Sequence, residues 1–120
     1  MKYLLMIYMN PTIFESLSEA EKQAIFDAHD NFLKPIRESG ELLGFVALAD
    51  PSNSRTVRVR DKVPAVTDGP YLESKEFLAG YYVVDCETPE RAEELAAMIP
   101  DAELTAIEVR PVMGDGGMEM

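Results

Sequence analysis

The stretch Lys2-Tyr3-Leu4-Leu5-Met6-Ile7-Tyr8-Met9 decides the fold, because it is apolar at both odd and even positions. Successive side chains of a strand point to opposite faces of a sheet, so this pattern predicts a strand that is buried on both faces. The same pattern recurs in residues 79–86, where the adjacent Tyr81 and Tyr82 would point to opposite faces of the sheet. If helices cover one face of the sheet, the other face needs a second cover. We therefore expect a homodimer in which two sheets pack face to face.

Working outward, the sequence predicts a long helix that begins after Ser16 or Ser18, each the start of a capping box, and ends near Ser39 before Gly40. Pro35 lies inside this helix and is expected to kink it. A second helix is predicted at 89–99. Further strands are expected at 41–49, 55–60, 79–86 and 102–112, with a long connection at 61–77. The order β-α-β-β-β-α-β predicts an α+β fold of the split βαβ type, with two helices on one face of an antiparallel sheet.

Length and composition bound the class of protein. The 120 residues fit one domain, taken as 1–113, followed by a flexible C-terminal tail at 114–120. The net charge of −11 argues against nucleic acid and against an anionic membrane as partners, and is best interpreted as solubility. No segment has the pattern of a signal peptide or a membrane span, so a cytoplasmic protein is expected. The single cysteine, Cys86, ends an apolar run and is interpreted as a buried structural thiol.

The most distinctive motif is Asp68-Gly69-Pro70-Tyr71. Asp can cap its own backbone, Gly supplies a positive φ, and Pro restricts the residue before it, so the motif predicts a rigid turn. Such a turn can present Asp68 and Tyr71 to a pocket. It can equally be an ordinary loop with a good turn, and turns outnumber sites.

His29 is the only histidine, and its helical spacing places it on the apolar face of the first long helix. Histidine titrates near neutrality and is a candidate general base. The alternative is a core or rim histidine with a structural hydrogen bond. Asp27 and Asp30 flank it in sequence but point to other helical faces.

Basic and aromatic side chains supply the remaining candidates. Arg58, Arg60 and Arg110 could anchor an anionic ligand, although pairing with surface carboxylates explains each of them singly. Tyr8, Tyr81 and Tyr82 could line a cleft, although strand aromatics usually belong to the core. One histidine and one cysteine cannot build a histidine-rich metal site, and no phosphate loop or dinucleotide fingerprint is present in the sequence. We therefore predict neither a metal nor a cofactor.

Several separated segments resemble the YCII-related proteins, specifically the DGPF-domain group. The segments are Met1–Tyr8, Thr56–Arg60, Asp68–Tyr71, Glu73–Tyr82 and Ile107–Val112. Tyr71 replaces the usual Phe and adds a hydroxyl. The resemblance implies a ferredoxin-like fold, a dimeric α+β barrel, and an active site built on a His–Asp pair, for which His29 and Asp68 are the candidates.

Two functions of different class follow. The first is a small-molecule-binding protein, with an anionic or aromatic ligand in a cleft between the first helix, the Asp-Gly-Pro loop and the sheet. If it is an enzyme, cofactor-free acid–base chemistry is expected, of the lyase type that one YCII-like group performs. His29 and Asp68 would be catalytic, and Tyr71, Arg58, Arg110 and Tyr81 would contact the ligand. The second is a non-catalytic accessory module, since DGPF-domain proteins often accompany alternative sigma factors.

Overall fold

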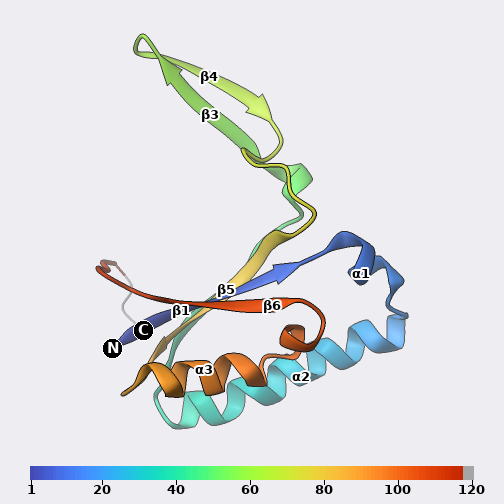
Figure 1. The fold of residues 1–120 in the computed structure, drawn as a ribbon, viewed down its shortest axis with the longest axis vertical. Coiled ribbons are helices and arrows are strands. Elements are labelled where there is room, and N and C mark those ends of the chain that lie inside the picture. The colour runs from blue at the N-terminus through green and yellow to red at the C-terminus, as the bar shows by residue number, and fades with distance from the viewer. Residues whose placement is uncertain (118–120) are drawn as a thin grey trace.

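A computed structural model of the chain, which describes residues 1–117, confirms the α+β class (Figure 1). Four strands form an antiparallel sheet in the order β2-β5-β1-β6, which is the order of a ferredoxin-like fold. In chain order the elements are β1 (Lys2–Met9), α1 (Pro11–Ser16), α2 (Glu19–Glu38), β2 (Leu42–Ala47), η1 (Pro51–Asn53), β3 (Arg55–Arg60), β4 (Val63–Asp68), β5 (Phe77–Asp85), α3 (Pro89–Met98), η2 (Pro100–Glu103) and β6 (Ala106–Pro111).

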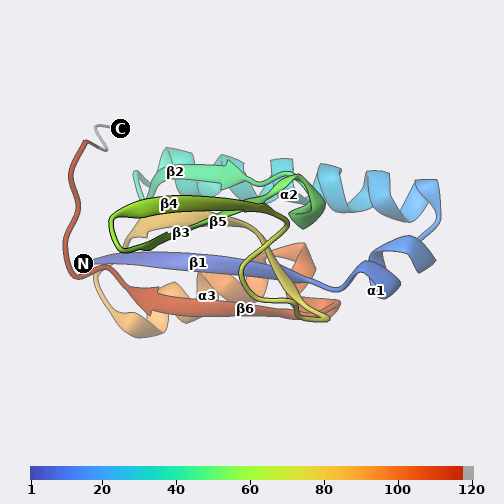
Figure 2. The ribbon, with the colours of Figure 1, turned by 90° about the horizontal axis from the view of Figure 1, so that it is seen from above.

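Helices α2 and α3 lie side by side on one face of the sheet, and the core fills the space between the two layers (Figures 1 and 2). Alternate residues of β1 face this core, as the burial of Tyr3, Leu5 and Ile7 shows. The helices contribute the buried side chains of Phe32, Leu33, Ile36, Ala92, Leu95 and Ala96. The sequence pattern of β1 therefore placed the central strand correctly.

Within residues 1–117, no helix covers the opposite face of the sheet, and the centre of this face is apolar (Figures 1 and 2). The register pairs Met6 with Tyr81 and Leu4 with Val83, and Val46 of the neighbouring strand also lies opposite Tyr81. These five residues alternate with the core-facing positions, and together they are called the open sheet face below. Its margin on β6 is polar, since Glu108 and Arg110 face Met6 and Leu4.

The first helical region is divided, contrary to the single helix expected from the sequence. Asn10 caps a short helix, α1, by accepting a hydrogen bond from Thr12 N at 2.9 Å, and Pro11 occupies its first turn. The capping box that starts α2 is that of Ser18 with Glu21, while Ser16 belongs to α1. Helix α2 continues through Pro35 to Glu38.

The connection predicted at 61–77 was wrong in its first half, which forms β4. Strands β3 and β4 pair as a two-stranded ribbon separate from the main sheet. Asp61 and Lys62 join them with φ values of 50° and 66°, as in a type I′ hairpin. Because this turn has neither Asn nor Gly, its sequence does not carry the usual hairpin signal.

The C-terminal part departs from the prediction in one further detail. The last strand was expected from residue 102, but residues 100–103 form the short helix η2 and β6 begins at Ala106. Residues 114–117 follow β6, and Asp115 pairs with Lys2. Residues 118–120 of the expected flexible tail lie outside the described residues.

Candidate active site

His29 of α2 joins two side chains from other elements. Its Nε2 lies 2.6 Å from Oδ1 of Asp101 in η2, and its Nδ1 lies 2.5 Å from the hydroxyl oxygen of Tyr82 in β5. The imidazole and the Tyr82 ring are stacked, with centroids 5.9 Å apart. The only histidine of the sequence is thus held at both ring nitrogens, and these three residues are called the His29 network below.

Burial keeps the Tyr82 hydroxyl of the His29 network protonated. Tyr82 is 4% exposed and Asp101 6% exposed. Burial, followed by the charges of Asp101 and Asp30, raises the pKa of Tyr82 to about 12, so its hydroxyl is protonated at neutral pH. With neutral imidazole, the Tyr82 hydroxyl therefore donates to Nδ1 and the Nε2–H donates to the Asp101 carboxylate.

Local backbone structure explains how Asp101 reaches this position. Thr88 and Pro89 start α3, and Pro100 follows its C-cap, Ile99, and opens η2. The carbonyl of Asp101 accepts hydrogen bonds from the backbone N–H groups of Leu104 and Thr105, at 3.0 and 2.9 Å. The resulting turn fixes Asp101 beneath α2, and its carboxylate faces His29.

Aromatic side chains surround the His29 network. Phe32 and Phe45 contact the Tyr82 ring, with centroid distances of 5.2 and 5.9 Å. Phe26 precedes His29 by three residues and so lies next to it on the helix surface. Phe26 is 60% exposed and Phe45 is 51% exposed, while the His29 side chain retains 21% exposure. The His29 side chain is therefore partly accessible, with Phe26 one helical turn away from it and Phe45 against the ring of its partner Tyr82.

The structure does not bring Asp68 to His29; Asp101 takes the place expected for it. Asp68 ends β4, its side chain is 96% exposed, and its Oδ1 lies 3.9 Å from Arg55 Nε. The Asp-Gly-Pro turn instead closes the base of the ribbon. Gly69, with φ 96°, donates its N–H to Ser54 O at 2.8 Å and accepts from the Thr56 hydroxyl at 2.9 Å.

The other predicted ligand residues fall into two groups, both apart from the His29 network. The Arg58 guanidinium lies over the Tyr71 ring, 5.1 Å from its centroid, at the ribbon. Tyr81 lies on the open sheet face, and Arg110 lies at its margin, where it pairs with Glu108.

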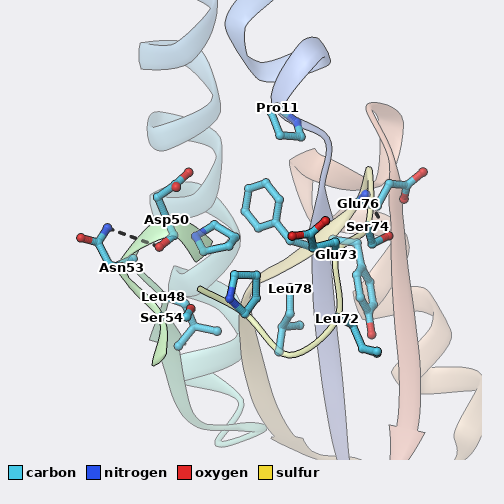
Figure 3. Close-up of a pocket in the computed structure, with 15 residues that line it drawn as sticks. Pro11, Leu48, Asp50, Asn53, Ser54, Leu72, Glu73, Ser74, Glu76 and Leu78 are labelled. Carbon is cyan, nitrogen blue, oxygen red and sulfur yellow. Dashed lines mark hydrogen bonds between the residues drawn. The ribbon is translucent and has the colours of Figure 1, made fainter. Parts of the chain in front are cut away.

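A separate cleft of about 740 Å³ lies at the base of the ribbon (Figure 3). It is bounded by Pro11, by Pro70 and Leu72 of the Asp-Gly-Pro loop, and by Tyr8 and Leu78 of the sheet. A cleft between these segments was expected, but the members of the His29 network are not among its lining residues. Its rim carries the carboxylates of Asp50, Glu73 and Glu76.

Sequence reasoning missed Asp101 and Tyr82 as partners of His29. Tyr82 has the strand pattern of a core residue, and its hydroxyl gives no periodic signal. Asp101 directly follows Pro100, which ends the predicted helix. An acidic residue at this position was the one local feature that could have marked Asp101 as a candidate. The pairing itself depends on η2 lying beneath α2, which is a tertiary contact.

Other classes of site are less well supported by the described residues. Within residues 1–117, no three histidine, cysteine, aspartate or glutamate side chains group as a metal site. Over the same range, no helix is long and apolar enough to cross a membrane. Cys86 is buried as expected, and burial raises the pKa of its thiol.

The fold and the partly buried His–Asp pair define a ferredoxin-like α+β protein with a candidate acid–base site. The family model for the YCII-related domain matches residues 1–114, and the chain belongs to this family. It is also similar to an uncharacterized protein of Rhizobium meliloti (strain 1021), with 26% identity over 114 residues, which cover 93% of this chain and 92% of that protein.

Proposed function

We propose that this protein binds a small molecule at the His29 network and performs cofactor-free acid–base chemistry there. The observation that carries the proposal is the contact of 2.6 Å between His29 Nε2 and the buried Asp101 carboxylate. A carboxylate that holds one ring nitrogen fixes the tautomer and stabilises the imidazolium that forms when the other nitrogen takes a proton. This arrangement supports a base, with the basic lone pair on Nδ1.

The proton would reach Nδ1 through Tyr82. As the ligand gives a proton to the Tyr82 oxygen, the Tyr82 hydroxyl gives its own proton to Nδ1, and the Asp101 carboxylate balances the imidazolium. Proton abstraction of this kind is the first half of the lyase-type elimination suggested by YCII-like relatives.

The ligand class follows from the surroundings. Phe26 lies one helical turn from His29 and Phe45 packs on Tyr82, and the exposure of both rings favours an aromatic ligand. The charges that act on Tyr82 come from Asp101 and Asp30, so the local field is negative. Between the two ligand classes expected from the sequence, aromatic and anionic, this environment supports the aromatic one.

NMR of the His29 ring tests the proposal directly, because the single histidine gives unambiguous signals. A panel of small aromatic compounds, with carboxylates as a comparison, should shift these signals and those of the Phe26 and Phe45 rings. A matched titration of Phe14→Leu, which changes an exposed ring on α1, should show the same shifts. Ring signals of His29 that ignore every compound would refute the proposed site.

The variant His29→Gln is preferable to His29→Ala for turnover assays. Alanine would leave the buried Asp101 and Tyr82 groups without a partner, so stability would fall together with activity. Glutamine retains hydrogen-bonding capacity but cannot act as the base. The proposal requires that His29→Gln abolish turnover while the protein remains folded by circular dichroism.

We also propose that the protein is a homodimer in the cytoplasm and that two open sheet faces pack together. A second sheet would cover Leu4, Met6 and Tyr81, and aligned sheets pack about 10 Å apart. Tyr81 and the Arg110 margin would then lie at the dimer interface.

A non-catalytic accessory module is the alternative, of the kind suggested by the association of the DGPF-domain group with alternative sigma factors. Two observations favour it: both His29 ring nitrogens are occupied, and the cleft at the ribbon base lies apart from them. Under this alternative, His29→Gln would change stability but no small molecule would move the His29 signals.

A further inference from the structure

We propose that the β3–β4 ribbon is a clasp that grips a second copy of this chain. The inference rests on the homodimer proposed above and names the element that seals it. The ribbon is the one part of residues 1–117 that stands away from the two-layer body, to which it is joined at its base (Figure 1). An isolated two-stranded hairpin is marginally stable in water, so a ribbon of this kind needs a surface to pack on.

One side of the ribbon is apolar, and the rest of residues 1–117 leaves it exposed. Val57 pairs with Val66, and Val59 pairs with Pro64, so these four side chains share one side. Val57, Val59 and Val66 are each more than half exposed, at 61%, 56% and 58%. Three exposed β-branched residues on one side of a ribbon are typical of a contact surface rather than of a solvated strand.

Charge favours a second copy of this chain as the partner. Residues 55–68 contain four basic and two acidic side chains, a net charge of +2, although the whole chain carries −11. The remaining residues therefore carry −13. A basic ribbon is attracted to a strongly acidic body, and the body of a second copy has this charge.

Position agrees with charge. The ribbon rises on the side of the sheet opposite α2 and α3, which is the side of the open sheet face (Figures 1 and 2). A second sheet packed there would lie about 10 Å away, whereas six-residue strands extend about 20 Å. The ribbon is therefore long enough to pass beside the partner's sheet.

Contacts at the base of the ribbon stabilise its orientation relative to the sheet. The Gly69 N–H bonds to Ser54 O, the Thr56 hydroxyl bonds to Gly69 O, and Arg58 stacks on Tyr71. The Asp-Gly-Pro turn would thus fix the direction in which the ribbon projects toward the partner.

Excision of the ribbon tests the clasp in the otherwise complete chain. Ser54 and Gly69 are already hydrogen-bonded, so residues 55–68 can be replaced by a short Gly-Ser linker with little change to the body. Sedimentation velocity over a hundredfold dilution should show a dimer for the wild type and a dissociation constant raised at least about tenfold for the excised protein.

A pair of adjacent substitutions gives a matched comparison. Val66→Glu places a charge on the apolar side, while Thr67→Glu adds the same charge on the opposite side of the same strand. We expect Val66→Glu to weaken the dimer about tenfold or more and Thr67→Glu to weaken it much less. Higher salt should also weaken the wild-type dimer, since opposite charges attract across the contact.

The outcomes separate the two proposals. A wild-type monomer at every concentration would overturn both the homodimer and the clasp. A dimer whose dissociation constant is the same in the wild type, the excised protein and Val66→Glu would retain the homodimer and overturn the clasp, and the ribbon would then belong to another partner. Equal effects of Val66→Glu and Thr67→Glu would overturn the assignment of the apolar side as the contact.

Discussion

His29 and Asp101 are 72 residues apart in the chain, and their side chains lie 2.6 Å from one another. The contact joins α2 to the turn after α3, and Tyr82 extends it to the centre of the sheet. Three elements are thereby connected through polar atoms within a mostly apolar layer. Such a network stabilises the fold only while each member keeps its partner, which makes its energetics testable residue by residue.

Substitution of Asp101 should separate the effect of charge from that of hydrogen bonding. Asp101→Asn keeps an acceptor for His29 Nε2–H but loses the charge, and we expect a loss of about 1 kcal/mol in the free energy of unfolding. Asp101→Ala leaves the imidazole N–H without its partner and should cost about 2–3 kcal/mol. Urea denaturation measures both. Glu93→Gln, on the exposed surface of α3, is the control and should change little. Equal stability of all three variants would contradict the network.

Adjacent tyrosines on opposite faces of β5 provide a second comparison. Tyr82→Phe removes the hydroxyl that bonds to His29 Nδ1 and should destabilise the protein by about 1–2 kcal/mol. Tyr81→Phe removes a hydroxyl on the open sheet face and should be close to neutral in dilute, monomeric protein. Chemical denaturation at low concentration checks the difference. The expectation fails if Tyr81→Phe costs as much as Tyr82→Phe.

Alkaline pH should weaken the native state through Tyr82. Its pKa is raised from 10.0 to about 12 in the folded protein, mainly by burial. The folded state therefore holds the phenolic proton more tightly than the unfolded state. This contribution to stability is complete below pH 10 and is lost as the pH rises toward 12. Denaturation curves from pH 8 to 12 should show a smaller alkaline decline for Tyr82→Phe than for the wild type. Identical declines would show that Tyr82 does not titrate in this way.

The sequence predicted the sheet better than it predicted the site. The continuous apolar run of residues 2–9 and the Thr88-Pro89 helix start are local signals, and both elements appear where expected. Strand β3 of the ribbon was predicted correctly, but β4 was missed because the type I′ turn between them uses Asp61 and Lys62, where Asn-Gly would have marked a hairpin. Asp61 and Lys62 adopt positive φ values although neither is a glycine or an asparagine, so the sequence gives little indication of this turn.

Of the His29 network, only His29 was singled out as a site candidate with an acid partner, for a related reason. His29 was identified because it is unique and lies on an apolar helix face, which are properties of one segment. Its partner was assigned to Asp68, since the Asp-Gly-Pro turn looked like the rigid part of a pocket. The turn is held by hydrogen bonds, but it closes the ribbon, and Asp101 gains its place from the position of η2 beneath α2. Partners fixed by tertiary packing require the fold.

The open sheet face predicts an effect of substitution on assembly. Met6 lies at its centre, between Tyr81 and Glu108, so Met6→Glu would place a charge inside the proposed interface. We expect dissociation to monomers by light scattering. Met98→Glu adds the same charge on the outer surface of α3, where Met98 is 49% exposed, and should leave the assembly unchanged. A dimer that survives Met6→Glu would place the interface elsewhere.

Gly80 offers a prediction about the sheet itself. It pairs with Ala47 of β2 and Ile7 of β1, and a Cβ at this position would lie 2.4 Å from the backbone oxygen of Val46. Because that neighbour is backbone, β2 would have to move away from β5. Gly80→Ala should therefore cost about 1–3 kcal/mol, as overpacking does elsewhere. Gly114→Ala is the matched control, since its added Cβ meets nothing within 4 Å. Thermal denaturation should show a lower Tm for Gly80→Ala alone, and an unchanged Tm would mean that β2 accommodates the methyl group without loss of its pairing.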